Sequence, residues 1–160
     1  MPKVLISDKL SIKAEEIFIK HGIEVTINTA LSPEELSKII GDYDGLAIRS
    51  NTKVTNDIIK HAKNLKVIGR AGIGVDNVDI ESATANGTIV MNTPFGNSIT
   101  TAEHTIALMM ALARNIPIAN TSTHLGKWEK SKYTGTELYS KVLGMIGCGN
   151  IGSIVADRAK

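Results

Sequence analysis

The sequence predicts an α/β protein with a parallel sheet, followed by the beginning of a dinucleotide-binding fold. Over the first 95 residues, short apolar runs alternate with amphipathic helical segments. Such alternation is typical of a parallel sheet with helices on both faces. Further along, Gly147, Gly149 and Gly152 form a G-x-G-x-x-G pattern between an apolar run and a helix-like run. In that context the pattern predicts a turn that receives a pyrophosphate at a helix N-terminus.

Five strands and four helices are expected in the first part of the chain. The expected strands are residues 4–7, 24–28, 45–49, 65–69 and 88–92, and the expected helices are residues 11–21, 32–41, 55–63 and 79–85. The clearest helix start is Ser32-Pro33-Glu34-Glu35. Ser32 takes the cap position, Pro33 the first helical position, and Glu35 closes a capping box.

The pattern changes after Pro94. A long helix is expected from Ser98 to Asn115, apolar over more of its circumference than one core face requires, which predicts burial on several sides. A second helix over 117–126 leads to a basic stretch, and a strand over 142–146 precedes the glycine turn and a last helix over 151–160. We therefore expect one domain over residues 1–95 and a second, incomplete part over residues 96–160.

Composition excludes several classes of function. The net charge of +2 comes from interspersed charges, which does not favour a nucleic-acid partner. The single Cys excludes an internal disulfide, and with four scattered His it offers no metal site. The longest apolar run, residues 106–113, is too short to span a membrane. With no signal-peptide pattern at the N-terminus, we expect a soluble, cytoplasmic protein.

Three loops that follow predicted strands could bind a ligand together. Arg49 and Ser50 follow the third strand, residues 70–74 (Arg-Ala-Gly-Ile-Gly) the fourth, and residues 94–98 the fifth. In a parallel sheet these loops meet at one edge, where ligands bind. Two guanidinium groups, hydroxyls and a glycine-rich backbone suit a small anionic substrate. Alternatively, each arginine is a surface charge at a strand end.

An ordered series of segments carries a closer resemblance. These are Asp8 and residues 49–55, 69–79, 91–98, 113–117, 126–128 and 147–152. Together they resemble the D-isomer-specific 2-hydroxyacid dehydrogenases over essentially the whole chain, and among them most closely the D-3-phosphoglycerate dehydrogenase subfamily. The resemblance implies a flavodoxin-like substrate-binding (catalytic) domain over residues 1–95. It also implies a dimerisation helix and the start of a Rossmann NAD-binding domain over residues 96–160.

The resemblance assigns roles to individual residues. Arg49, Ser50 and Asn97 match positions that contact the substrate phosphate and carboxylate, and Gly72, Ile73 and Gly74 match the backbone that approaches the carboxylate. The matches to the cofactor site are Ile73 at the nicotinamide end and Gly147, Gly149, Asn150, Ile151 and Gly152 at the pyrophosphate. The helix from Ser98 to Asn115 matches the dimerisation helix. Trp128 and Lys130 match a loop that reaches into the partner subunit's site, although the basic stretch could equally be a solvated face.

The resemblance also implies what the chain lacks. Family catalysis uses an arginine that orients the carboxylate and a histidine acid–base whose pKa is held by a glutamate, and none of the three is expected within this chain. We therefore expect a truncated, by itself inactive part of an enzyme that uses NAD to oxidise 3-phosphoglycerate, a phosphorylated 2-hydroxy acid, in the first step of phosphorylated serine biosynthesis. The alternatives are a sibling dehydrogenase of the glyoxylate or hydroxypyruvate type and a non-catalytic binding or assembly module.

Overall fold

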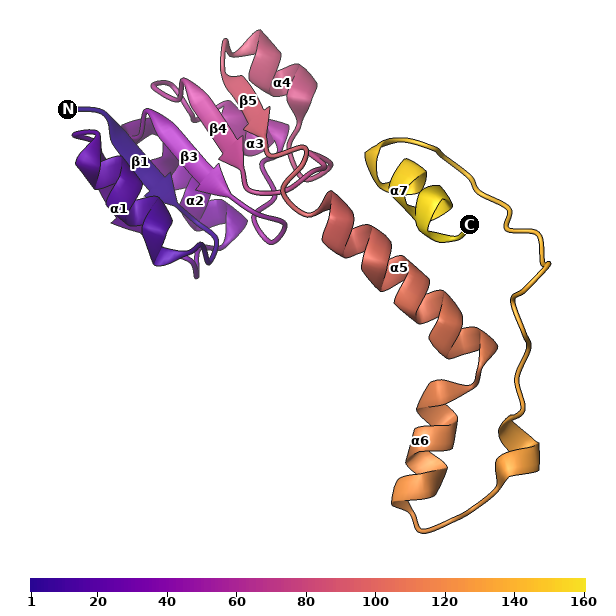
Figure 1. Ribbon diagram of the computed structural model, residues 1–160. Coiled ribbons are helices and arrows are strands. Elements are labelled where there is room, and N and C mark those ends of the chain that lie inside the picture. Colours follow the sequence, from indigo (N-terminus) through magenta and orange to yellow (C-terminus); the bar gives the residue numbers. More distant parts are fainter. The chain divides into compact units, whose positions relative to one another are not determined.

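A computed structural model describes all residues from Met1 to Lys160, and the chain divides into two compact units, Met1–Gly96 and Asn97–Lys160. The first unit contains a parallel sheet of β1 (Lys3–Ile6), β2 (Glu24–Ile27), β3 (Gly45–Ile48), β4 (Val67–Arg70) and β5 (Ile89–Asn92) in the order β2-β1-β3-β4-β5 (Figure 1). This is the flavodoxin-like order, and the predicted fold class is confirmed.

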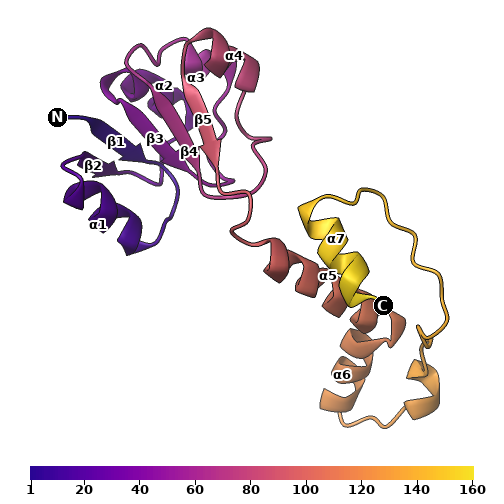
Figure 2. The ribbon, with the colours of Figure 1, turned by 45° about the horizontal axis from the view of Figure 1, so that its top comes forward.

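Helices cover both faces of the sheet, but unequally (Figure 2). The helices of this unit are α1 (Ile12–Lys20), α2 (Pro33–Ile39), η1 (Ile40–Asp42), α3 (Asn56–Ile59) and α4 (Ile80–Ala85). The larger core lies between the sheet and α2, α3 and α4, and includes Leu5, Ile48 and Ile68. On the other face, Phe18 of α1 packs against a smaller cluster around Ile6. The sheet is therefore most deeply buried on the side of α2 to α4.

The predicted capping box forms at the start of α2. The Ser32 hydroxyl accepts the Glu35 N–H at 3.2 Å, and a Glu35 carboxylate oxygen accepts the Ser32 N–H at 2.8 Å. This backbone N–H, followed by the Ser32 side chain, holds the pKa of Glu35 below its usual value of 4.5. Local sequence chemistry thus fixes where this helix begins.

The third helix is shorter than predicted. The expected helix over residues 55–63 ends at Ile59, and turns lead from there to β4. Ala62 and Leu65 are 0% and 3% exposed, so the chain turns after one helical turn to bring both side chains into the core. The helix ends early because these two residues are buried, which the hydrophobic periodicity of the sequence does not indicate.

The second unit is helical. Its elements are α5 (Ser98–Ala113), α6 (Ile116–His124), η2 (Lys130–Tyr133) and α7 (Asn150–Arg158). The prediction of a strand over residues 142–146 is wrong for this structure: these residues form no strand, and Val142 is 98% exposed. A strand needs a partner for its backbone groups, and residues 97–160 contain no other strand.

Helices α5 and α7 of this unit lie side by side (Figure 1 and Figure 2). Arg158 of α7 forms an ion pair with Glu103 of α5 at 3.1 Å. Burial of α5 is less than expected: only Ser98 and Ala102 are buried, and Leu112 is 81% exposed. None of the helices has both the length and the hydropathy that crossing a membrane requires.

Candidate functional site

The carboxyl ends of β3, β4 and β5 lie in register. Ile48 pairs with Arg70, and Arg70 pairs with Asn92, so the three following loops leave the sheet at the same edge. The Ala71 N–H donates to the Ile48 carbonyl at 2.8 Å, which ties the second loop to the end of β3. The expected meeting of these three loops at one edge is confirmed.

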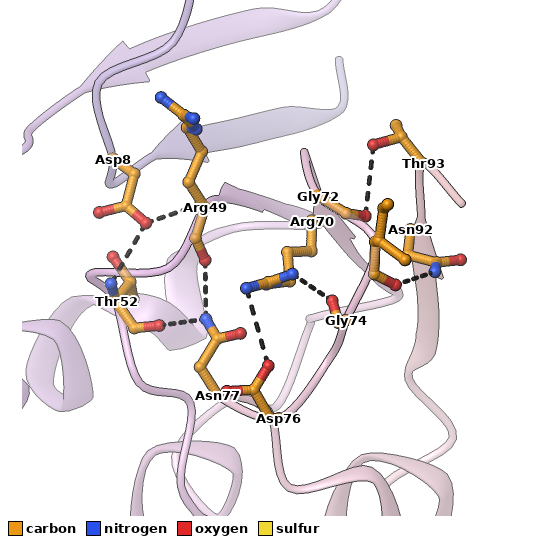
Figure 3. Close-up of polar contacts among 11 residues, drawn as sticks. Asp8, Arg49, Thr52, Arg70, Gly72, Gly74, Asp76, Asn77, Asn92 and Thr93 are labelled. Atoms are coloured by element: carbon orange, nitrogen blue, oxygen red, sulfur yellow. Dashed lines mark hydrogen bonds and ion pairs between the residues drawn. The ribbon is translucent and has the colours of Figure 1, made fainter. Parts of the chain in front are cut away.

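The turn from Arg49 to Thr52 is held by two side chains from other loops (Figure 3). Asp8, which follows β1 and is 3% exposed, accepts the Arg49 N–H at 2.6 Å and the Thr52 N–H at 3.2 Å through one carboxylate oxygen. Asn77 donates its amide to the Arg49 carbonyl and the Thr52 carbonyl, both at 2.7 Å. The backbone at both ends of the turn is thereby fixed.

This turn leaves its two polar side chains free. Arg49 and Ser50 are exposed, and no hydrogen bond or ion pair engages the guanidinium or the hydroxyl. In Figure 3 the Arg49 side chain extends away from Asn77 and the carbonyls that Asn77 binds. A fixed backbone with a free guanidinium can take a carboxylate or phosphate in bidentate fashion.

Arg70 does not provide a second free guanidinium, and that expectation is wrong. Its side chain is only 11% exposed, donates to the Gly74 carbonyl, and lies 3.8 Å from an Asp76 carboxylate oxygen. A Cβ on Gly72 would approach the Arg70 Cζ to 3.2 Å, so a larger residue at position 72 would require the guanidinium to shift. Arg70 thus shapes the loop that follows β4.

The same loop is anchored to β5 through its carbonyl groups. Asn92 donates to the Ile73 carbonyl at 2.6 Å, and the Thr93 N–H donates to the Gly72 carbonyl at 2.9 Å. The Gly72 N–H is bound to the Arg70 carbonyl at 2.9 Å, whereas the N–H groups of Ile73 and Gly74 have no partner. Two successive free N–H groups are an arrangement that binds anions.

The two loops are joined into one piece. The Val54 N–H donates to the Asn77 carbonyl at 2.8 Å, and the Asp79 N–H donates to the Val54 carbonyl at 2.9 Å. Asp79 then caps α4, and the Ser82 backbone N–H that it accepts at 2.9 Å lowers its pKa from the usual 3.8. Arg70 pairs with Asp76 and Asp8 is engaged by backbone, which leaves Arg49 and the exposed Lys53 as the cations of these loops without an ion pair; of the two, only Arg49 lies in the turn that Asp8 and Asn77 hold.

Sequence reasoning did not assign roles to Asp8, Asn77, Asn92 and Thr93. All four residues entered the sequence analysis only as parts of the segments that carry the resemblance. The partners of Asp8 lie 41 and 44 residues away, and those of Asn77 lie 28 and 25 residues away. A local sequence pattern cannot indicate contacts between residues so far apart in the chain. Predicting them would have required the register of the strands in the sheet.

The glycine turn of the second unit leads into a helix, as its pattern predicts, although no strand precedes it. Gly147 has φ +92°, in the left-handed region, and Gly149 is the N-cap of α7 without any side-chain cap. A Cβ on Gly149 would meet no atom within 4 Å, whereas one on Gly152 would collide with the Gly147 carbonyl oxygen. An uncapped helix start with open space at Gly149 fits a pyrophosphate group at Asn150, Ile151 and Gly152.

The remaining predicted residues also lie in the second unit. Asn97 is the N-cap residue of α5, with no side-chain cap hydrogen bond. Trp128 is 84% exposed, and Lys130 begins η2. Next to them, Glu129 accepts the Ser122 hydroxyl at 2.7 Å, which holds the pKa of Glu129 below its usual 4.5.

Fold and site together define a parallel α/β protein with a free guanidinium and free N–H groups at the carboxyl edge of its sheet and a glycine-rich turn at a helix start later in the chain. The chain belongs to the D-isomer specific 2-hydroxyacid dehydrogenase family, whose catalytic-domain model matches residues 4–157.

Relatives within the family share about half of the sequence. The chain is 50% identical over 158 residues to the D-3-phosphoglycerate dehydrogenase of Archaeoglobus fulgidus, covering 99% of this chain and 30% of that protein. It is 53% identical over 156 residues to the D-3-phosphoglycerate dehydrogenase of Sus scrofa, covering 98% of this chain and 29% of that protein. The chain thus spans less than a third of the length of these curated relatives.

Solved structures show the same fold. The NAD-dependent formate dehydrogenase of Staphylococcus aureus, solved in complex with NAD, matches with a TM-score of 0.87 and 27% identity, over 99% of this chain and 53% of that one. The NAD+-bound 3-phosphoglycerate dehydrogenase of Entamoeba histolytica matches with a TM-score of 0.78 and 33% identity, over 99% of this chain and 50% of that one.

Proposed function

We propose that this chain is the substrate-anchoring part of an NAD-dependent D-3-phosphoglycerate dehydrogenase, which oxidises 3-phosphoglycerate to 3-phosphohydroxypyruvate in serine biosynthesis. The observation that carries the proposal is the free Arg49 guanidinium at the same sheet edge as the free N–H groups of Ile73 and Gly74. A ligand with two anionic ends, a phosphate and a carboxylate, matches a site with two separate anion-binding elements. Identity of about half to phosphoglycerate dehydrogenases supports this substrate over others of the family.

Each element has a distinct task in the proposed reaction. Arg49 and Ser50 bind one anionic end, with Asn97 as a further contact, and the N–H groups of Ile73 and Gly74 bind the other. Holding both ends orients the C2–H bond and saves the entropy of aligning the substrate during the reaction. When bound, NAD would accept the hydride that leaves C2, and the turn of Gly147, Gly149 and Gly152 with the start of α7 would hold its pyrophosphate. Ile73 would then lie at the nicotinamide end.

The proton of the C2 hydroxyl needs a base from elsewhere. In the first unit, His21 and His61 follow α1 and α3 and precede β2 and β4, which places them at the opposite edge of the sheet. Their Nδ1 atoms lie 2.8 and 2.7 Å from backbone carbonyl oxygens. We infer that proton transfer uses the arginine, glutamate and histidine of the family, outside residues 1–160, and that this chain alone is inactive.

Substituting Arg49 tests the substrate proposal. We expect the Arg49→Gln variant to bind 3-phosphoglycerate about 10- to 100-fold more weakly than the wild type, because a charge-assisted bidentate contact is lost. Amide chemical-shift titrations with 3-phosphoglycerate and with unphosphorylated glycerate measure both affinities. Lys63→Gln, at an exposed site before β4, is the control and should bind as the wild type does.

The outcomes separate the alternatives. Equal affinity for glycerate and 3-phosphoglycerate would favour a sibling dehydrogenase of the glyoxylate or hydroxypyruvate type. Binding of neither would favour a non-catalytic assembly module. Unchanged binding of 3-phosphoglycerate by Arg49→Gln would show that Arg49 does not bind the substrate.

We further infer that two copies of the chain pack together through α5. Its exposed residues include Leu108 at 57%, Met110 at 44% and Leu112 at 81%, and large apolar side chains gathered on one exposed element are typical of a surface that binds a partner. Trp128 and Lys130 would then reach the partner's site. Sedimentation at micromolar concentration should show a dimer, and Leu108→Glu with Leu112→Glu should give a monomer. A monomeric wild type would contradict the inference.

A further inference from the structure

The turn that carries Arg49 is held on both sides of its backbone by side chains that do not reach the ligand themselves. At each end of the turn, Asp8 takes the N–H group and Asn77 takes the C=O group, as the four dashed lines at Arg49 and Thr52 in Figure 3 show. All four backbone groups that define the ends of the turn are therefore bound by two side chains. We call Asp8 and Asn77 the turn clamp.

Asp8 holds the backbone of the turn in place, although its negative charge disfavours an anion nearby. Its carboxylate is 3% exposed, and no cation pairs with it; its partners are the two N–H groups of the turn. A buried negative charge next to an anion site repels the ligand. The carboxylate can therefore assist anion binding only through the position that it gives the turn.

Asn77 links the clamp to the second anion-binding element. It lies in the segment that follows the loop of Ile73 and Gly74, and its own carbonyl accepts the Val54 N–H at 2.8 Å. The orientation of its amide is fixed, because both partners are carbonyl oxygens and only the NH₂ group can donate to them. Displacement of Asn77 would shift the Arg49 turn and the glycine loop relative to each other.

We propose that Asp8 and Asn77 are positioning residues of the anion site, which set the distance between Arg49 and the N–H groups of Ile73 and Gly74. This proposal rests on the proposed function, since it takes the loops at this edge as the substrate site. The clamp acts on ligand affinity through the turn, and neither side chain contacts the substrate.

The experiment compares three clamp variants with two chemically matched controls. Asp8→Ala removes the acceptor, Asp8→Asn keeps an acceptor without the charge, and Asn77→Asp places a carboxylate against two carbonyls. Asp44→Asn is the control for the carboxylate, because Asp44 accepts the Lys3 N–H at 2.9 Å before β3. Asn64→Asp is the control for the amide, because Asn64 donates to the Gly41 carbonyl at 2.7 Å before β4.

Two probes, 3-phosphoglycerate and inorganic phosphate, are titrated against each variant while amide exchange is recorded at Arg49 and Thr52. We expect Asp8→Ala and Asn77→Asp to bind 3-phosphoglycerate about tenfold more weakly or worse, with faster exchange at these two amides. Asp8→Asn should recover part of the lost affinity, and both controls should stay within about twofold of the wild type. Circular dichroism shows whether each variant is folded. If Asp8→Ala is unfolded, Asp8→Asn and Asn77→Asp still test the proposal.

Three results would overturn the proposal. Tighter anion binding by Asp8→Ala and Asp8→Asn would show that Asp8 acts only as a repelling charge. Equal losses in the clamp variants and controls would show a general effect on stability. Wild-type protein that binds neither probe would overturn the clamp and the substrate site together, whereas binding of phosphate without preference for 3-phosphoglycerate would overturn the proposed substrate and leave the clamp to be judged by its variants.

Discussion

Replacing Gly152 by alanine should open the glycine turn and weaken dinucleotide binding by more than about 100-fold. The Cβ would collide with the Gly147 carbonyl oxygen and lie 3.3 Å from the carbonyl carbon, and both are backbone atoms that no change of rotamer can move. Either the turn or the start of α7 must shift, and with it the N–H groups proposed to receive the pyrophosphate.

NAD titration, followed by the amide signals of residues 150–152, measures this effect. Gly144→Ala is the control, since its Cβ would meet nothing within 4 Å. Gly149→Ala is a second comparison: its Cβ also meets nothing in the free protein, so its amide signals should stay while NAD binding weakens through the ligand's close approach. Unchanged signals for residues 147–153 in Gly152→Ala would show that the close approach of Gly152 to Gly147 is not needed.

The sequence predicts those features of the fold that depend on neighbouring residues. The capping box at Ser32 and Glu35 was predicted from residues three positions apart, and the structure contains it. The parallel sheet follows from the alternation of short strands and helices, which needs no knowledge of particular contacts.

Features that depend on distant partners were missed or wrong. The run over residues 142–146 has the composition of a strand, but strand formation depends on a neighbouring strand, which residues 97–160 do not supply. Arg70 carries the same charge as Arg49, yet one is folded into its own loop and the other is free. What separates them is the glycine at position 72 and the carboxylate at Asp76, whose relevance appears only once the loop is closed.

Replacing Ile48 by alanine should lower the free energy of unfolding of the first unit by about 2–5 kcal/mol. Ile48 is 0% exposed and lies on β3, between β1 and β4, in the core beneath α2 to α4. Loss of its side chain removes buried apolar area and leaves a cavity between a central strand and its helices. Because net stabilities are about 5–15 kcal/mol, this is a large part of the total.

Urea unfolding of Ile48→Ala and Ile27→Ala makes the comparison direct, because both remove the same atoms from a strand of one sheet. Ile27 lies on the edge strand β2 and is 51% exposed, so its loss should cost less than about 1 kcal/mol. Ile48 also precedes Arg49, and its backbone carbonyl accepts the Ala71 N–H, so a shift of β3 towards the cavity would move both loops of the proposed anion site. Saturating 3-phosphoglycerate should therefore stabilise Ile48→Ala less than the wild type, because a ligand that binds only the folded state stabilises it according to its affinity. Equal losses in the free energy of unfolding for the two variants would contradict the central role given to β3. The same loss with and without 3-phosphoglycerate would show that Ile48 does not affect ligand binding at the proposed site.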